Sequence, residues 1–220
     1  MACIDFVQKL HTSTNRDYLG RVLEADKAHC AEIALAWDHN YWDGDRKYGY
    51  GGYRYDGRWY AVAEAMATHY GLSSGARILD VGCGKAFLLH EFTQVVPEAR
   101  VRGIDISDYA LANAKEEVKP HLIRSNAIAL PFPDHSFDLV YSINTLHNLR
   151  NFELDAALAE IERVARGPRH ITVESYRTER QKMNLLYWQL TCRSFYSPAE
   201  WEWFFERSGY GGDYSYIYFD

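Results

Sequence analysis

Near the middle of the chain stands the sequence Ile78-Leu79-Asp80-Val81-Gly82-Cys83-Gly84-Lys85-Ala86. A short, mostly apolar run leads into two closely spaced glycines, and a helical pattern follows them. Glycine lets a backbone turn tightly and approach a ligand closely, and a helix that begins there presents unpaired N–H groups. These nine residues therefore predict a buried strand, a ligand-binding turn and the start of a helix.

Strands and helices alternate on the C-terminal side of this turn. The pattern predicts strands at residues 77–81, 101–105, 122–125, 137–143, 169–174 and near 214–219, and helices at 86–95, 108–118 and 152–165, with two more before the last strand. Such alternation is typical of βαβ units and a parallel sheet. We expect an α/β, Rossmann-like fold with a mainly parallel sheet of six or seven strands and helices on both faces.

The N-terminal part has a different character. Residues 17–37 carry a helical pattern, residues 43–57 are rich in Gly, Tyr and Asp and read as a loop, and a helix is expected at 59–70. Aromatic residues make up 15% of the chain and gather in the loop region and at the C-terminal end, so the two groups are expected to meet over one site. We divide the chain into a helical segment and lid, 1–60, and a core, 61–220, whose C-terminal helices line the acceptor.

Composition excludes several functions. The net charge is −6, which disfavours a nucleic-acid or anionic-membrane surface. No apolar run reaches the length of a membrane span, and the N-terminus lacks a signal-peptide pattern. The four cysteines are far apart, which disfavours a zinc site or a disulfide framework. We expect a cytoplasmic monomer or homodimer without metal, acting on a small molecule.

A second feature specifies the ligand of the glycine turn. Asp105 follows Gly84 by 21 residues and ends the second predicted strand, where an acidic group accepts hydrogen bonds from ribose hydroxyls. Position 87 is Phe where a dinucleotide fold has Gly, and no P-loop pattern is present. Asp80 would repel a pyrophosphate and attract an ammonium or sulfonium group. Together these residues indicate S-adenosylmethionine (SAM), with S-adenosylhomocysteine (SAH) as product.

Over about residues 77–175 the sequence resembles the class I SAM-dependent methyltransferases. The resemblance implies that Gly82 and Gly84 cradle the methionine part, that Asp105 holds the ribose, and that Ile106 packs on the adenine. Asn126 would meet the adenine amine, where many relatives have Asp. It also assigns Cys83, Lys85, Ala127 and Ser142 to the cofactor site. The motifs that carry it are Leu79-Asp80-Val81-Gly82-Cys83-Gly84, Gly103-Ile104-Asp105-Ile106-Ser107, Asn126-Ala127 before Leu130-Pro131-Phe132, and Phe137-Asp138-Leu139-Val140-Tyr141-Ser142.

Catalytic candidates follow the fourth and fifth strands, because α/β sheets bind ligands at the carboxyl ends of their strands. Methyl transfer requires an aligned acceptor, exclusion of water and, for some acceptors, removal of a proton. His147 is a candidate base, and Asn144 and Asn148 are candidates to orient the acceptor. Glu174 is expected to hold a cationic group or take a proton, and Tyr55 is added as a fourth catalytic candidate.

The remaining candidates bind the substrate. Tyr48, Tyr50 and Tyr53 offer flat faces with hydroxyl tips, on a loop whose glycines allow it to close over SAM. Arg58 is expected to pair with a carboxylate of SAM or of the substrate. After the fifth strand, Tyr176 and Arg177 complete the substrate-binding set.

A narrower resemblance extends over about residues 41–220. Residues 48–59, 142–148 and 174–178 look like the methyltransferase domain of the ovothiol-biosynthesis enzyme, which methylates an imidazole nitrogen, and like stand-alone methyltransferases of bacterial polysaccharide clusters. The first hypothesis is therefore N-methylation of a histidine derivative such as 5-thiohistidine. The alternatives are O-methylation of a sugar or other polar metabolite, and a non-catalytic SAM-binding module.

Overall fold

The computed structural model describes residues 1–12 and 16–220. Within them six strands form one sheet in the order β3-β2-β1-β4-β5-β6. All neighbouring pairs are parallel, and the order reverses beside β1, where β2 lies on one side and β4 on the other. The strands are β1 (Arg77–Val81), β2 (Arg100–Asp105), β3 (Leu122–Arg124), β4 (Leu139–Ile143), β5 (Arg169–Glu174) and β6 (Asp213–Ile217). The expected α/β fold is thus confirmed, with six strands.

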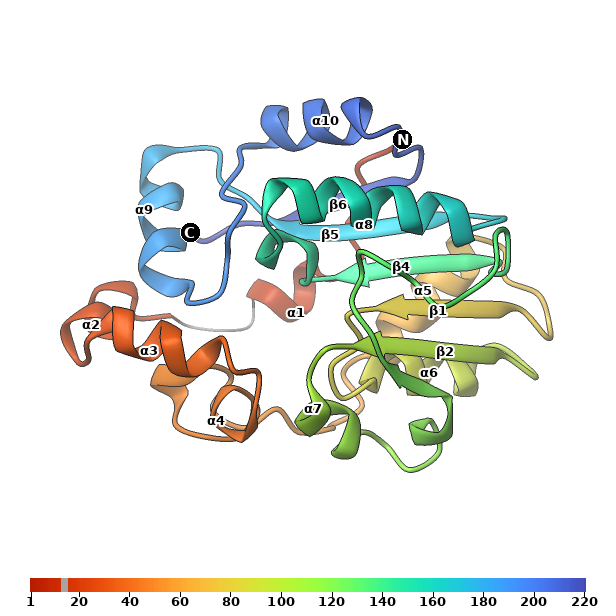
Figure 1. Cartoon of the computed structure of the whole chain (residues 1–220), viewed down its shortest axis with the longest axis horizontal. Helices are drawn as coiled ribbons and strands as arrows, with labels where there is room; N and C mark the ends of the chain where they lie inside the picture. The colour runs from red at the N-terminus through yellow and green to blue at the C-terminus, as the bar shows by residue number, and fades with distance from the viewer. Residues whose placement is uncertain (13–15) are drawn as a thin grey trace.

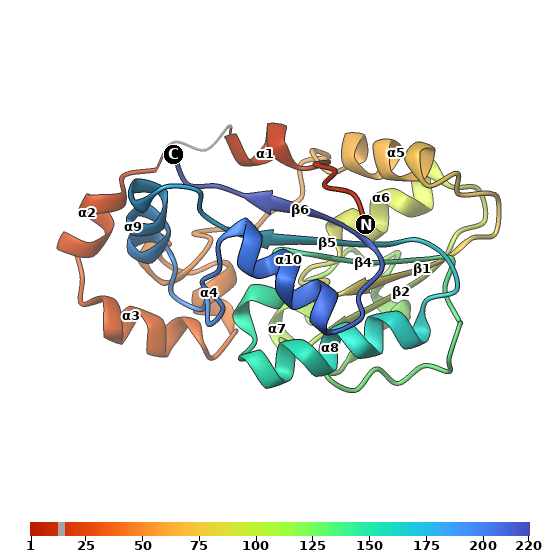
Figure 2. The ribbon, with the colours of Figure 1, turned by 90° about the horizontal axis from the view of Figure 1, so that it is seen from above.

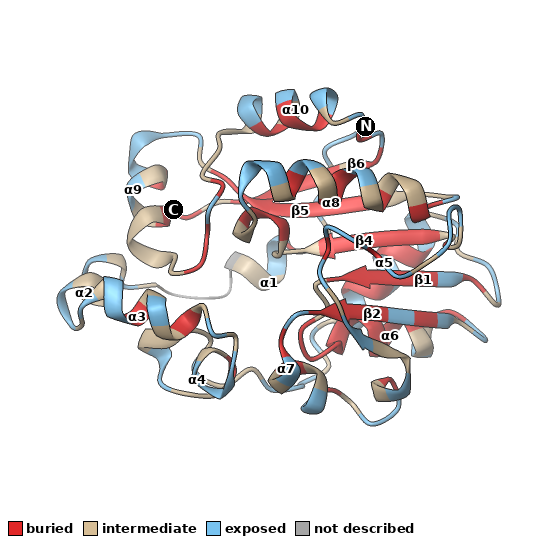
Figure 3. Ribbon diagram, in the orientation of Figure 1, coloured by how far each residue is buried: buried red, intermediate tan, exposed pale blue. Residues whose placement is uncertain are grey.

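Helices cover both faces of the sheet. In Figure 2, α5 (Tyr60–His69) and α6 (Phe87–Val95) lie on one side, and α8 (Asn151–Val164) and α10 (Pro198–Arg207) lie on the other. Ile78 packs into the α5–α6 core, whereas Leu79 and Val81 pack into the α8–α10 core. Burial on both faces explains why the strands read as almost continuous apolar runs, and Figure 3 shows them buried along most of their length.

A cap of helices lies beyond the carboxyl ends of the strands (Figure 1). It consists of α2 (Tyr18–Leu23), α3 (Lys27–Ala34), α4 (His39–Trp42), the 3₁₀ turn η1 (Arg46–Tyr48) and, from the other end of the chain, α9 (Glu179–Trp188). The shorter elements α1 (Gln8–Thr12), α7 (Asp108–Ala112), η2 (Lys119–His121) and η3 (Leu146–Asn148) complete the fold. The cap and the sheet edge together enclose the site.

The structure corrects three expectations. The helical pattern at 17–37 is divided into two helices, because Asp26 caps α3 by accepting hydrogen bonds from the N–H groups of Ala28 and His29. The helix at 108–118 ends as α7 at Ala112. The first residues of the expected lid segment do not cover the site, since the N–H of Ile4 donates to Tyr214 of β6 at 2.8 Å.

The last strand of the sheet runs in the same direction as the others, since β6 is parallel to β5 over five residue pairs. Cys3 makes an isolated parallel bridge to Tyr214, so the N-terminal residues lie along the outer side of β6.

Candidate active site

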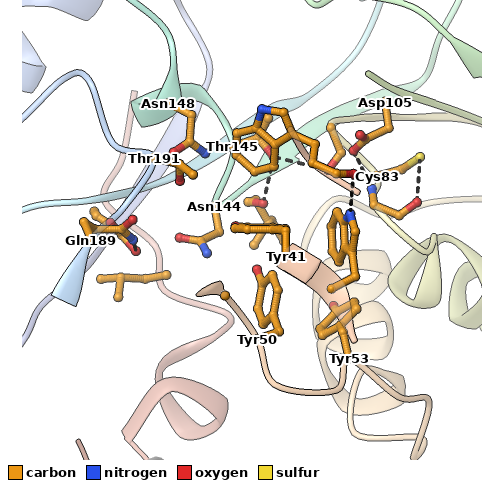
Figure 4. A pocket seen from close by; sticks show the side chains of 18 of the residues that line it. Tyr41, Tyr50, Tyr53, Cys83, Asp105, Asn144, Thr145, Asn148, Gln189 and Thr191 are labelled. Carbon is orange, nitrogen blue, oxygen red and sulfur yellow. Dashed lines mark hydrogen bonds between the residues drawn. The ribbon is translucent and has the colours of Figure 1, made fainter. Parts of the chain in front are cut away.

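A cavity of about 590 Å³ lies between the carboxyl edge of the sheet and the helical cap. One end is formed by the turn after β1 and the end of β2, and the other by the ends of β4 and β5 with residues after α9. Figure 4 shows that Asp105 and Cys83 lie toward one side of this space and Gln189 and Thr191 toward the other, with three tyrosines between. We call the end of the cavity at the glycine turn, where the methyl donor SAM is expected, the donor end. We call the end at β5, where the methyl acceptor is expected, the acceptor end.

The glycine turn leaves no room for side chains. Gly82 and Gly84 have φ angles of +83° and +53°, which favour glycine. A Cβ on Gly82 would lie 2.2 Å from Cγ2 of Thr145, and one on Gly84 would lie 2.6 Å from Cη2 of Trp42. The two glycines thus form a close-fitting cradle at the start of α6.

Asp105 is fixed at the wall of the donor end. Its Oδ2 accepts from the N–H of Gly84 and its Oδ1 from the N–H of Ser107, both at 2.8 Å. Burial raises the pKa of this carboxyl, and the backbone N–H groups oppose that change. Next to it, Ile106 lines the cavity while 45% exposed, which is the flat apolar surface that an adenine ring would cover.

Asp80 supplies a buried carboxyl at the same end. Burial raises its pKa to about 8; the Tyr141 hydroxyl opposes this shift, and the charge of Asp105 adds to it. A cation bound beside Asp80 would stabilise its ionised form. The cradle, the carboxyl of Asp105 and this second carboxyl fit a nucleoside with a cationic sulfonium and ammonium, as SAM has.

The cap is attached to the glycine turn through Lys85. This side chain is 4% exposed, and its ammonium contacts Asp43 at 2.6 Å and the carbonyl of Tyr53 at 2.8 Å. Tyr53 also stacks on Phe87, at a centroid distance of 5.0 Å. Lys85 therefore holds the Tyr- and Gly-rich segment instead of lining the cavity, which corrects its expected contact with the cofactor.

Glu174 is the charged group at the acceptor end. It is 3% exposed, and burial raises its pKa to about 8. Gln189 donates to its Oε1, and Nε2 of His147 lies 3.5 Å from its Oε2. His147 is buried behind Glu174, and burial lowers its pKa to about 3. The imidazole is therefore neutral and supports Glu174 from outside the cavity, which corrects the expectation of His147 as the base that meets the acceptor.

Aromatic rings and amides form the remaining acceptor wall. Tyr41 and Tyr50 pack edge to face, with centroids 5.4 Å apart. Asn144 has a φ of +59°, and its Oδ1 is buried without a hydrogen-bond partner among the described residues. Thr191 donates to Oδ1 of Asn148 at 2.8 Å. An unpartnered amide oxygen inside a cavity is a ready acceptor for a ligand N–H or O–H group.

The structure brings most of the predicted residues to one cavity. Those that line it are Asp80, Gly82, Cys83, Gly84, Asp105, Ile106, Asn126, Ala127 and Arg58 from the cofactor set, Asn144 and Glu174 from the catalytic set, and Tyr50, Tyr53 and Asn148 from the substrate set. Arg58 pairs with its neighbour Asp56, with Nε 2.7 Å from Oδ2, so its guanidinium is already engaged.

Five further predicted residues lie elsewhere. Tyr55 packs against His90 outside the cavity, with centroids 5.5 Å apart. Ser142 donates to the carbonyl of Val81 and joins two strands. The rest are absent from the cavity wall: Tyr48 in η1, and Tyr176 and Arg177, which follow β5 and contact Lys182 and Tyr218.

Sequence reasoning missed several residues of the wall. Tyr41 and Trp42 belong to the aromatic cluster that the sequence made visible, and that cluster was the available signal. The other missed residues of the wall belong to no recognised motif: Thr191, Gln189, Arg16, Arg21 and Arg46. Within residues 1–12 and 16–220, no group of three His, Cys, Asp or Glu is arranged to hold a metal ion, and no helix is long and apolar enough to cross a bilayer.

Comparisons with known proteins match the part of the chain that contains the glycine turn. Residues 79–168 match the family described as "Methyltransferase domain". A SAM-dependent methyltransferase from Aquifex aeolicus has a similar fold, with a TM-score of 0.50 and 24% identity over 67% of this chain and 78% of that one. Residues 79–168, less than half of the chain, are thus similar to a methyltransferase domain, and the fold is that of the class I methyltransferases. The methyl donor of this class is SAM, as the sequence predicted.

Curated relatives match less than half of the chain. Demethylmenaquinone methyltransferase of Geobacillus stearothermophilus is 37% identical over 109 residues, which are 46% of this chain and 45% of that protein. Sterol 24-C-methyltransferase ERG6B of Gibberella zeae is 34% identical over 107 residues, 45% of this chain and 27% of that protein. The chain thus spans less than half of the length of these relatives.

Proposed function

We propose that this chain methylates a small polar acceptor, and that the acceptor is an imidazole nitrogen of a histidine derivative. The observation that carries the proposal is Glu174, a buried carboxyl in the wall of the cavity that begins at the glycine turn. Its position suits a group that meets the reacting part of the acceptor. The narrower resemblance to an imidazole N-methyltransferase points to the same acceptor class.

The polarity of the acceptor wall supports a polar substrate. Asn144, Asn148, Gln189, Thr191 and Glu174 all line this end. A sterol or a prenylated quinone would need an apolar channel, since burying unpaired polar groups against hydrocarbon costs roughly 1–3 kcal/mol each. The parts of the acceptor wall at 41–50 and 174–191 also lie outside the matched range 79–168. Similarity within that range therefore does not indicate which substrate this chain methylates.

The proposed chemistry assigns Glu174 to the proton. Bound SAM supplies an electrophilic methyl group. As the ring nitrogen forms its bond to the methyl carbon, the carbon–sulfur bond breaks with its electron pair going to sulfur. The reacting nitrogen is the ring nitrogen without a proton, and the proton on the other ring nitrogen passes to the ionised form of Glu174, whose fraction grows as the pH approaches the raised pKa of about 8. Tyr41 and Tyr50 hold the flat ring and exclude water.

A panel of acceptors tests this function. The protein is incubated with SAM and either L-histidine, 5-thiohistidine, a monosaccharide, or a short-chain demethylmenaquinol, and SAH and methylated products are followed by mass spectrometry. Methylation of an imidazole nitrogen, lost in Glu174→Gln and kept in the surface control Glu179→Gln, is the expected result. Methylation of the sugar alone, or SAH binding without turnover of any acceptor, would contradict it.

The second candidate is C-methylation of a quinone ring, favoured by the name of the Geobacillus stearothermophilus relative. It ranks lower because of the polar wall described above. Product analysis separates the two, since only the quinol would carry a new carbon–carbon bond.

A further inference from the structure

Three arginines surround one tryptophan at the wall of the cavity. The guanidinium carbons of Arg16, Arg21 and Arg46 lie 5.4, 4.6 and 4.9 Å from the ring centroid of Trp188. The four residues come from three separate stretches of sequence, and all of them line the cavity. Trp188 is followed directly by Gln189, the residue that donates to Glu174.

Two of these arginines have no acidic partner within the part of the chain that the structure describes. Arg21 donates through Nε to the carbonyl of Trp188 and through one terminal nitrogen to the carbonyl of Arg46, both at 3.0 Å. Arg46 donates to the carbonyls of Gly49 and Tyr50 at 3.0 and 2.8 Å. No described carboxylate forms an ion pair with either. Backbone carbonyls satisfy part of each donor fork and leave the charges unneutralised.

The positive charges of the neighbouring arginines lower one another's pKa values. Burial lowers the pKa of Arg21 to about 10, and the neighbouring charge of Arg46 contributes in the same direction. The pKa of Arg46 is lowered by burial and by Arg16. Capping of α9 explains part of this arrangement, since Lys27 also donates to the carbonyl of Leu186 near the same helix end. Arg46 instead donates to the carbonyls of Gly49 and Tyr50, so capping of α9 does not account for its charge at this corner.

We propose that Arg21 and Arg46, with Trp188 as a flat support, bind an oxyanion carried by the methyl acceptor, a carboxylate or a phosphate monoester. The proposal rests on the proposed function and names the substrate class more closely. A planar guanidinium fork is suited to either anion. The reacting ring would then lie toward Glu174 and its anionic group toward the arginines, which orients the acceptor at two points.

The test measures binding of simple probes to the protein saturated with SAH. Benzoate, phenyl phosphate and the neutral benzamide are compared by calorimetry at low and high salt. The expected result is that at least one anion binds about tenfold more tightly than benzamide and loses this advantage at high salt. The stronger of the two anions identifies the source of the oxyanion. This readout is independent of turnover, so failure of the proposed function with histidine derivatives would leave it intact.

Variants assign the effect to the arginines. Arg46→Gln and Arg21→Gln are expected to weaken the anion by about tenfold each, and Arg46→Lys to weaken it less. SAH affinity is expected to stay unchanged, circular dichroism and thermal melting report that each variant is folded, and Arg54→Gln serves as a surface control. Equal affinity for benzoate, phenyl phosphate and benzamide would overturn the proposal. So would loss of SAH affinity in folded Arg46→Gln with anion binding preserved, because the arginines would then serve the donor carboxylate.

Discussion

In the interior of the protein, Nε2 of His147 lies 3.5 Å from Oε2 of Glu174, and the two side chains are 2% and 4% exposed. The backbone N–H of Glu174 points to Nδ1 of the same ring at 3.4 Å, so the ring proton is assigned to Nε2. His147 therefore lies as a neutral ring beside the Glu174 carboxyl, behind the cavity wall, with its Nε2–H near an oxygen that has no hydrogen-bond partner among the described residues.

Replacing His147 should change a pH profile. We expect kcat to rise with pH around the pKa of Glu174, near 8, because the ionised form accepts the proton. His147→Leu replaces the polar ring beside Oε2 with an apolar side chain, which strengthens the desolvation that raises the pKa of Glu174, so the inflection should move to higher pH. His147→Gln, which retains a donor, should restore part of the shift. A profile that stays in place while kcat falls would indicate a purely structural role for His147.

The buried carboxyls also predict how stability depends on pH in the absence of ligand. Asp80 and Glu174 have pKa values raised to about 8, so they stay protonated in the folded state while the unfolded state ionises near pH 4. Stability is thus lost as pH rises toward 8. His147, His170 and His11 have lowered pKa values of about 3, 4 and 4, and their contribution is lost as pH falls below about 6.5.

Between pH 6.5 and 8, Asp80 and Glu174 are the two of these five groups that make the free energy of unfolding depend on pH. The free energy of unfolding should fall there by up to about 1.4 kcal/mol per pH unit for each carboxyl. Urea unfolding at three pH values measures the slope. Asp80→Asn and Glu174→Gln should each reduce it, and a slope that is unchanged in both variants would refute the assignment.

The ion pair between Lys85 and Asp43 predicts local loosening of the cap. Lys85→Met leaves the Asp43 carboxylate without its cation and should cost roughly 2–3 kcal/mol. The loss should be confined to the segment around residues 37–58, where hydrogen exchange and cleavage after Arg46 or Lys47 should increase. Lys119→Met, at a surface pair with Glu116 outside this segment, is the matched control. Equal exchange throughout the sheet would mean that Lys85 stabilises the whole fold instead.

Asp105 predicts the energetics of donor binding. Asp105→Ala should weaken SAH binding by roughly 1–3 kcal/mol, as expected for lost charge-assisted hydrogen bonds. Part of that loss would come from Gly84 and Ser107, which also bind the carboxylate. Calorimetry with SAH gives the value, and an unchanged affinity would show that the ribose is held elsewhere.

The donor half was readable from sequence because its requirements are local. A strand, two glycines at positive φ and an acid at the end of the next strand lie within 28 residues, and β1 and β5 have the predicted bounds. The acceptor half was not readable in the same way. Tyr41, Arg46, Trp188 and Thr191 meet through tertiary packing, which no spacing encodes. Loop geometry likewise decided that Tyr55 faces outward and Tyr50 inward.

The contact between Arg21 and Trp188 joins two segments that are 167 residues apart in the chain. One consequence concerns chimaeric enzymes. A graft that exchanges the early helices with those of another methyltransferase, but leaves the region after β5 untouched, would place foreign side chains against the native indole and break the substrate chamber. The early helices and the region after β5 would have to be exchanged together, while the part of the chain that contains the glycine turn could stay unchanged.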